Sequence, residues 1–211
     1  MTHYPTTLIA SHNPNALRPD LRVIADHILQ NPRERVIDVG CGDGSLIAAL
    51  AEESGIDVRG MEIDAELVER CVSRGLSVVQ GDANRDLADY PDKAFDYAIL
   101  SQTLQTAQRP DWLLEQLLRI GKEAFVSFPN FAYWRMRLSL LRNGRMPVTP
   151  HLPISWYETP NIHHLTIADF RSFVAEREVM IKGEWFFAKG REISGRNANM
   201  RAEHAVFQLS R

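Results

Sequence analysis

The sequence contains little cysteine, no long apolar run and no strong excess of either charge. Its two cysteines, Cys41 and Cys71, are too few for a disulfide framework, so we expect reduced thiols in a cytoplasmic protein. No uninterrupted apolar run reaches the roughly 18 residues of a membrane span, and the N-terminus lacks the pattern of a signal peptide. A net charge of −3 gives no reason to expect binding to nucleic acid or to a membrane.

The composition is that of one ordinary globular domain. Hydrophobic residues make up 45% of the 211 residues and charged residues 24%. Residues 1–16 hold proline, threonine, histidine and asparagine with little periodicity, which predicts a loose N-terminal arm. Residues 17–211 are long enough for a single domain with a full core.

A short apolar strand followed by three glycines stands in the first quarter of the chain. Val36–Val39 is β-branched and apolar apart from Asp38, which predicts a buried strand. The glycines occupy every second position: Gly40, Gly42 and Gly44. Apolar helical spacing resumes between Leu46 and Leu50, with Ser45 at the position of a helix cap. A strand, a glycine turn and a helix form a nucleotide-binding layout, because the helix N-terminus offers free N–H groups to a ligand.

The spacing of these glycines favours S-adenosylmethionine (SAM) over a dinucleotide. Dinucleotide oxidoreductases use G-x-G-x-x-G, whereas this chain has G-x-G-x-G preceded by Asp38. The pattern D-x-G-x-G-x-G resembles the first motif of class I SAM methyltransferases. Glu62 ends the next apolar run, where a carboxylate can accept hydrogen bonds from both ribose hydroxyls. The alternative is that the glycines form only a tight turn.

The methyltransferase resemblance implies a set of residues around SAM or S-adenosylhomocysteine (SAH). Asp82 follows the third predicted strand, where its carboxylate would accept a hydrogen bond from the adenine amino group; the alternative is that it caps the next turn. Ser101 and Gln102 end the fourth strand, and their backbone would hold the methionine part. The expected cofactor-binding residues are Asp38, Gly40, Cys41, Gly42, Gly44, Glu62, Ile63, Asp82, Ala83, Ser101 and Gln102.

The order of predicted elements indicates a doubly wound α/β domain. A helix over Pro19–Gln30 comes first, and five strands then alternate with helices, which requires a mostly parallel sheet. The predicted strands are Val36–Val39, Val58–Ile63, Ser77–Gln80, Phe95–Ser101 and Ala124–Phe128, and the later helices are Ser45–Ser54, Asp64–Cys71, Pro110–Ile120 and Thr166–Glu176. Two closing strands, Val179–Phe187 and His204–Leu209, complete the Rossmann-like seven-stranded methyltransferase architecture, with a polar loop, Lys189–Ala202, between them.

The region 131–165 interrupts this alternation and is predicted to be an insert after the fifth strand. It combines a helix over Phe131–Leu141 with a proline-rich extended stretch, Met146–Pro160. Four arginines and no acidic residue lie between Phe131 and His151, beside an apolar helical face: the arginines are Arg135, Arg137, Arg142 and Arg145, and the face is Trp134, Leu138 and Leu141. Such a surface is either a solvated basic face or a docking site for an acidic partner.

Several stretches together resemble the MetW family of methionine-biosynthesis proteins over about residues 17–173. They are Leu17–Leu21 (LRPDL), Leu100–Gln105 (LSQTLQ), Phe128–Arg135 (FPNFAYWR), Gly144–Pro147 (GRMP) and Leu152–His163 (LPISWYETPNIH). The resemblance implies a class I methyltransferase fold. It also implies that the protein supports or activates homoserine O-acyltransferase (homoserine O-acetyltransferase). It names no methyl acceptor, so an active methyltransferase on an unidentified small molecule is the alternative. The stretch Ser101–Leu104 lacks the Asn/Asp-Pro-Pro-aromatic pattern of enzymes that methylate DNA bases or protein glutamine.

Two adjacent histidines in the insert are candidates for a catalytic base or for metal ligands, and no catalytic residue is otherwise identified. His163 would have to reach the acceptor proton, and the competing interpretation is that it packs and hydrogen-bonds within the insert. His163 and His164 point to opposite sides of an extended segment and have no zinc-like partners, so we expect no metal site. Trp134, Trp156 and Tyr157 either cover the ligand crevice or belong to the core.

Overall fold

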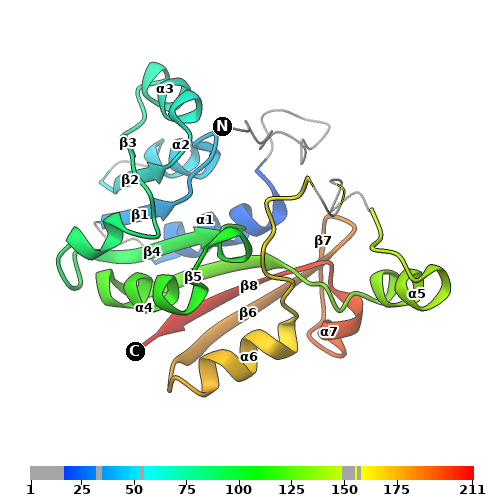
Figure 1. Ribbon diagram of the computed structural model, residues 1–211. Coiled ribbons are helices and arrows are strands. Elements are labelled where there is room, and N and C mark those ends of the chain that lie inside the picture. Colours follow the sequence, from blue (N-terminus) through cyan, green and yellow to red (C-terminus); the bar gives the residue numbers. More distant parts are fainter. Residues whose placement is uncertain (1–16, 32–34, 53–54, 149–154, 156–157) are drawn as a thin grey trace.

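A computed structural model describes residues 17–31, 35–52, 55–148, 155 and 158–211. The expected N-terminal arm, residues 1–16, lies outside the described residues, as do Trp156 and Tyr157. The described strands form one eight-stranded sheet in the order β3-β2-β1-β4-β5-β8-β6-β7 (Figure 1). The strands are β1 (Arg35–Val39), β2 (Asp57–Glu62), β3 (Val78–Gln80), β4 (Phe95–Ser101), β5 (Gly121–Pro129), β6 (Met180–Ala188), β7 (Arg191–Ile193) and β8 (His204–Ser210).

The first five strands are parallel, as the alternation of elements predicts. β1 pairs in parallel with β2 and β4, β2 with β3, and β4 with β5, whereas β8 runs antiparallel to β5 and β6. The strand order therefore changes direction between β1 and β4, which in doubly wound folds is where ligands bind. The expected doubly wound α/β architecture is confirmed.

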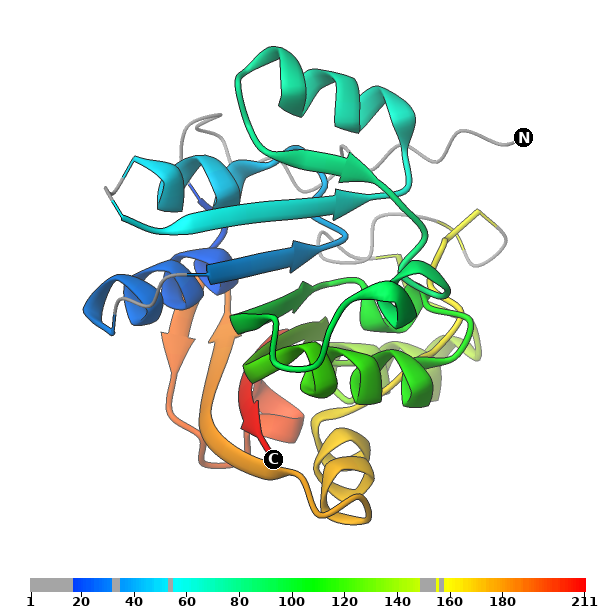
Figure 2. The ribbon, with the colours of Figure 1, turned by 90° about the vertical axis from the view of Figure 1, so that its left-hand side faces the viewer.

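Helices cover both faces of this sheet (Figure 2). They are α1 (Pro19–Gln30), α2 (Ser45–Ala51), α3 (Ala65–Ser73), α4 (Pro110–Ile120), α5 (Trp134–Asn143), α6 (Ile167–Ala175) and α7 (Ala198–Arg201), with 3₁₀ turns η1 (Asp86–Asp89) and η2 (Leu104–Thr106). α4 and α6 pack on one face of the sheet, and α1 and α2 pack on the other. Successive residues of a strand point to opposite faces, so in β4 Tyr97 and Ile99 face α1, while Ala98 and Leu100 face α4.

The sheet has one strand more than predicted, because the expected polar loop Lys189–Ala202 contains β7 and α7. Lys189 and Gly190 both have positive φ angles, 52° and 71°, and this two-residue turn folds β7 back onto β6. Asparagine or aspartate is usual at the first of these positions, and lysine gives no such signal. The connection between β3 and β4 contains η1.

The expected cap of α2 is also wrong. Gly44, with φ of 73°, is the N-cap residue and has no side chain with which to cap the helix. Asp43 Oδ1 instead accepts hydrogen bonds from the Ser45 backbone N–H at 3.1 Å and from the Ser45 hydroxyl at 2.5 Å. By contrast, Asp64 caps α3, since its carboxylate accepts hydrogen bonds from the backbone N–H groups of Glu66 and Leu67.

The insert begins with a turn and then forms α5, which extends away from the sheet (Figure 1). Asn130 Oδ1 accepts a hydrogen bond from the Ala132 N–H, and this turn delays the start of the helix to Trp134, beyond the predicted Phe131. The described residues of the expected extended stretch, 146–148, 155 and 158–160, belong to no helix or strand.

Candidate functional site

The glycine turn after β1 is open to a ligand at one of its three glycines. At Gly40, φ is 73°, and an added Cβ would lie 2.5 Å from Thr103 Oγ1, so the missing side chain makes room for the loop after β4. At Gly42, φ is 57°, and an added Cβ would meet no atom within 4 Å. Close approach by a ligand is therefore expected at Gly42, while Gly40 serves the packing of two strand ends.

Glu62 at the end of β2 holds the turn from the neighbouring strand. Its Oε2 accepts a hydrogen bond from the Gly42 N–H at 2.8 Å, and its Oε1 accepts from the N–H groups of Ile63 and Asp64 at 2.9 and 3.1 Å. A carboxylate has about four acceptor positions, so Oε2 keeps one for a ligand hydroxyl. The next side chain, Ile63, is 61% exposed and offers an apolar surface beside this carboxylate.

Asp38 at the end of β1 is a buried carboxylate with an unsatisfied oxygen. The residue is 2% exposed, and its Oδ1 has no hydrogen-bond partner. Burial raises the pKa of Asp38 to about 7; the charge of Arg18 opposes this rise, and the charges of Glu62, Asp20 and Asp43 add to it. A ligand that brought a cation or a donor to Oδ1 would satisfy this oxygen and favour the ionised carboxylate.

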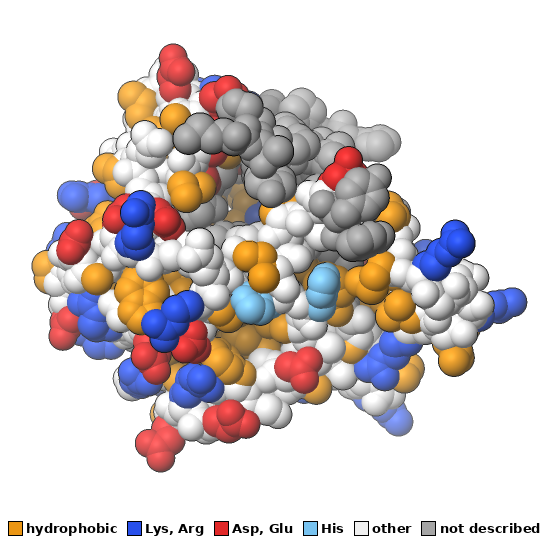
Figure 3. Space-filling model, in the orientation of Figure 1, with side chains coloured by type: hydrophobic (Ala, Val, Ile, Leu, Met, Phe, Trp, Pro, Cys, Tyr) orange, Lys and Arg blue, Asp and Glu red, His pale blue; other side chains and the backbone are white. Residues whose placement is uncertain are grey.

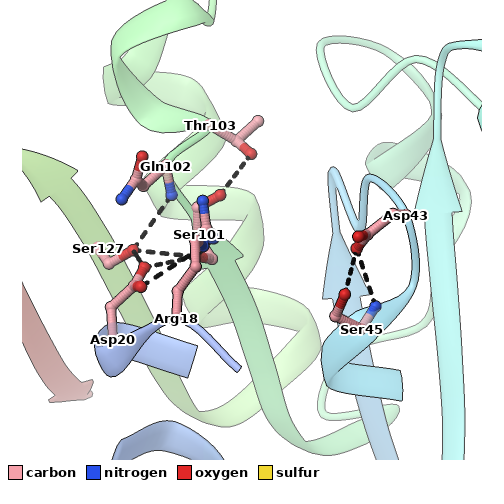
Figure 4. Close-up of polar contacts among 8 residues, drawn as sticks. All are labelled: Arg18, Asp20, Asp43, Ser45, Ser101, Gln102, Thr103 and Ser127. Carbon is pink, nitrogen blue, oxygen red and sulfur yellow. Dashed lines mark hydrogen bonds and ion pairs between the residues drawn. The ribbon is translucent and has the colours of Figure 1, made fainter. Parts of the chain in front are cut away.

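Arg18 and Asp20 join the ends of β4 and β5 in a polar cluster that the residue patterns alone did not predict (Figure 4). Asp20 Oδ2 accepts hydrogen bonds from Ser101 Oγ and Ser127 Oγ at 3.1 and 3.0 Å, and Arg18 donates to Ser101 Oγ at 2.9 Å. Arg18 Nε lies 3.5 Å from Asp20 Oδ1. Burial opposes ionisation of Asp20, but Arg18, His204 and the two hydroxyls outweigh it and hold the pKa of Asp20 below its ordinary value.

A sequence signal for this cluster exists in α1. Asp20 precedes Ile24 by four residues and Ile28 by eight, so it lies on the apolar face of an amphipathic helix. An acidic residue on such a face is buried, and a buried charge requires partners. The cluster thus ties α1 to the edge of the sheet where β1, β4 and β5 end.

The loop after β4 brings Ser101 and Gln102 to this edge. Gln102 has a φ of 51°, which is unusual for a residue other than glycine. Its N–H donates to the carbonyl oxygen of Ser127 at 2.9 Å and contacts Ser127 Oγ at 3.2 Å, so β5 fixes this conformation. Ser101 contributes its side chain to the cluster, while its carbonyl oxygen accepts from Thr103 Oγ1.

Asp82 and Ala83 follow β3 at the same end of the sheet. Asp82 Oδ1 accepts hydrogen bonds from the backbone and side-chain N–H groups of Asn84, both at 2.9 Å, and Oδ2 forms an ion pair with Arg85 at 3.3 Å. The carboxylate therefore caps its own turn, while Ala83 packs against the core. Binding of the adenine amino group by Asp82 stays a prediction.

Neither cysteine has the surroundings of a nucleophile. Both are free and buried, and burial raises the pKa of the Cys41 thiol and of the Cys71 thiol. Cys41 Sγ points toward β2, where a Cβ added to Gly60 would lie 2.7 Å from it. Cys41 therefore lies in the ligand turn with its side chain directed into the core.

The two histidines of the insert face different surroundings. The His164 ring contacts Phe131, with ring centroids 4.5 Å apart, whereas the His163 Nε2 is buried without a hydrogen-bond partner. Within the described parts of the chain, no group of three histidine, cysteine or acidic residues could hold a metal ion. Trp134, at 43% exposure, begins α5 on the surface.

The residues at this edge fit SAM on three counts. The side-chain space at Gly42 is open, Glu62 keeps an acceptor position beside the apolar Ile63, and Asp38 carries an unsatisfied oxygen. A ribose and an adenine fit the second feature, and an α-ammonium group fits the third.

None of the described helices is long and apolar enough to cross a membrane.

Comparison with solved structures identifies the class of fold. The chain matches a magnesium protoporphyrin IX methyltransferase of Synechocystis with bound SAH at a TM-score of 0.65, with 15% identity over 90% of this chain and 81% of that one. It matches a SAM-dependent methyltransferase of Mesorhizobium loti at a TM-score of 0.63, with 16% identity over 90% of this chain and all of that one. The chain has the Rossmann-like fold of the class I SAM methyltransferases.

Sequence comparison then gives the family. The model of the family "Methionine biosynthesis protein MetW" matches residues 18–209, and the chain belongs to this family, as the sequence motifs predicted. A protein of Rhodopirellula baltica, named bifunctional methionine biosynthesis protein MetXA/MetW, is 35% identical over 188 residues. An ajmaline N-methyltransferase of Rauvolfia serpentina is 28% identical over 100 residues. These matches cover 83% and 44% of this chain but only 30% and 33% of the two relatives.

Proposed function

We propose that this MetW family protein binds SAM in the cytoplasm and supports a homoserine O-acyltransferase in methionine biosynthesis. The observation that carries the proposal is the relative whose name joins MetXA and MetW in one bifunctional chain, of which this chain spans 30%. Two proteins joined in one chain stay at a high effective concentration relative to each other, which is an advantage when the two act together. We propose the same association for the region that this chain represents.

In this proposal SAM lies across the carboxyl ends of β1, β2 and β4. Glu62 would accept hydrogen bonds from the ribose, Ile63 would pack against the adenine, and Asp38 would face the α-ammonium group. SAM supplies a methyl group on a positively charged sulfur, which needs mainly proximity and orientation to react. The Gly42 N–H donates to Glu62 Oε2, so a ligand at Glu62 would lie beside the glycine turn.

The partner surface in this proposal is the exposed side of α5. Leu138 and Leu141 are 39% and 84% exposed, and the Arg135 guanidinium lies 5.3 Å from the centre of the Trp134 ring. Basic side chains gather at the end of the molecule where α5 lies (Figure 3). A shallow hollow beside the helix is lined by Ser139, Asn143, Arg145, Met146, Pro147 and Val148. Apolar side chains interleaved with arginine are typical of interfaces, and their charge suits an acidic partner.

The direct test is to express this chain together with the homoserine O-acyltransferase of the same cell. Tagged acyltransferase should retain the chain through purification at moderate salt, and homoserine acylation should be faster with the chain than without it. Failure of both co-purification and stimulation would contradict the proposal. SAH binding is measured separately on the isolated chain, so loss of the partner role and loss of the SAM role are distinguishable.

An active methyltransferase on a small molecule is the second candidate. The similarity of 100 residues to ajmaline N-methyltransferase, whose name describes methyl transfer to nitrogen, favours it. Radiolabelled SAM incubated with the purified chain and a small-molecule extract would yield a labelled product only if this candidate holds. The absence of labelled product while acylation is stimulated would favour the partner role.

A further inference from the structure

Two neighbouring residues, beside the sheet edge where SAM is proposed to bind, each have a buried polar atom without a hydrogen-bond partner. They are Gln105, in η2 after β4, and His163, in the insert. Gln105 Oε1 and His163 Nε2 both lack a hydrogen-bond partner. Leaving such an atom buried and unpaired is destabilising, which makes each a candidate for pairing with a ligand.

The rest of the Gln105 side chain is firmly positioned. The residue is 4% exposed, and its Nε2 donates to the carbonyl oxygen of Gln102 at 2.7 Å. Because a carbonyl oxygen only accepts hydrogen bonds, this contact fixes which end of the amide is nitrogen. The unpaired atom is therefore the amide oxygen, and a group that pairs with it must be a donor.

His163 is held against Gln105 through the backbone. The N–H groups of Ile162 and His163 both donate to the carbonyl oxygen of Gln105, at 2.9 and 3.0 Å. On the other side, the Phe131 ring contacts His164, and the Phe131 N–H donates to the carbonyl oxygen of Leu165 at 3.2 Å. The segment 162–165 is thus attached at both ends, which keeps His163 beside η2.

We propose that Gln105 and His163 form a binding subsite for the hydroxyl group of a small neutral molecule. A hydroxyl group donates one hydrogen bond and accepts others, so one group can donate to the Gln105 amide oxygen while it pairs with the imidazole nitrogen of His163. No hydrogen bond or ion pair joins either side chain to a charged side chain in the described parts of the molecule, which favours a neutral ligand over an ion. The competing occupant is a structural water, which can pair with the same two atoms.

The position of the subsite places its ligand near SAM. Gln105 belongs to the same loop as Gln102 and Thr103, and Thr103 packs against the glycine turn at Gly40. A hydroxyl compound at His163 would therefore lie at the same edge of the sheet as the proposed SAM residues. The inference does not depend on SAM being bound, and it holds whether or not methyl transfer follows.

The test uses 2-propanol and acetone as probes, because they share a carbon skeleton and only 2-propanol can donate a hydrogen bond. Each is titrated into the full chain, and the side-chain ¹⁵N and ¹H resonances of His163 are followed by NMR. We expect 2-propanol to shift these resonances with a dissociation constant about tenfold lower than that of acetone, as one added hydrogen bond provides.

Matched variants locate the effect. Gln105→Met should abolish the preference for 2-propanol, as observed on the resonances of His163. His163→Phe should abolish the shift that 2-propanol causes in the side-chain amide of Gln105; His163 is only partly buried, so this variant keeps the test available if Gln105→Met fails to fold. His164→Ala, on the exposed neighbour, should leave the preference unchanged. Equal responses to the two probes, or a preference that survives both variants, would overturn the proposal and assign the two atoms to a structural water.

Discussion

Replacing Asp38 by asparagine should stabilise the unliganded protein at pH 8 while it weakens SAM binding. The carboxylate is 2% exposed, and burial raises its pKa to about 7. An aspartate in an unfolded chain has a pKa of about 3.9. The folded protein therefore holds this proton more tightly than the unfolded chain does, which stabilises the fold at low pH.

The sign and size of the effect follow from linkage. The contribution of Asp38 to the free energy of unfolding is greatest below about pH 4, falls as the pH rises, and is lost above about pH 7. A difference of about three pKa units corresponds to about 4 kcal/mol, which is an upper limit for the gain in Asp38→Asn at pH 8. Asparagine has the same shape and no charge, so the gain should vanish near pH 4.

Urea unfolding of the wild type and the variant at pH 4, 5, 6, 7 and 8 measures this difference. Asp20 has a lowered pKa and so stabilises the fold above its unfolded pKa, but it is present in both proteins and its contribution cancels to first order. The difference in the free energy of unfolding should grow from pH 4 to pH 7 and then level off. A difference that does not change with pH would refute the reasoning. The same variant should bind SAH more weakly at pH 8, because its amide cannot pair with the α-ammonium group as a carboxylate does.

Three further predictions concern the ligand edge and the surface of α5. Glu62→Ala should weaken SAH binding by about 1.5–3 kcal/mol, because it removes hydrogen bonds to a charged group; unchanged affinity in calorimetry would contradict the assignment. Gly42→Val should abolish SAH binding in a protein that circular dichroism shows to be folded, since the side-chain space at Gly42 is open to the ligand; normal binding would place the site elsewhere. Reversing Arg135, Arg137 and Arg142 to glutamate should disrupt co-purification with the acyltransferase and its stimulation while SAH binding survives. A variant that changes only Arg135 and Arg142 is the control for structure, because Arg137 also donates to the Ala132 carbonyl oxygen at 2.6 Å; retention of the partner by both variants at moderate salt would contradict the interface.

Much of the fold could be predicted from the sequence wherever the spacing of apolar residues and the prolines that mark the start of a helix agree. The bounds of α1 and α4 match the predicted Pro19–Gln30 and Pro110–Ile120, since proline begins each helix and an apolar stripe runs through it. β4 matches the predicted Phe95–Ser101 because a buried parallel strand forms a continuous apolar run. These elements carry their signals locally.

The remainder depended on contacts between distant residues. The sequence did not reveal that the missing Cβ of Gly40 makes room for Thr103, which lies 63 positions further along the chain. The cluster of Asp20, Ser101 and Ser127 joins residues 81 and 107 positions apart, and spacing along the chain does not reveal such pairs. The turn at Lys189 takes a conformation that its sequence does not favour, because β6 and β7 pair on either side of it.

The measurement that tests SAM binding most directly is calorimetric titration of the purified chain with SAH and, separately, with NAD. Glu62, Asp38 and the open Gly42 predict one site of micromolar affinity for SAH and no binding of NAD. Binding of NAD at the same site, or no binding of SAH by the folded chain, would contradict the assignment of this edge of the sheet as a SAM site.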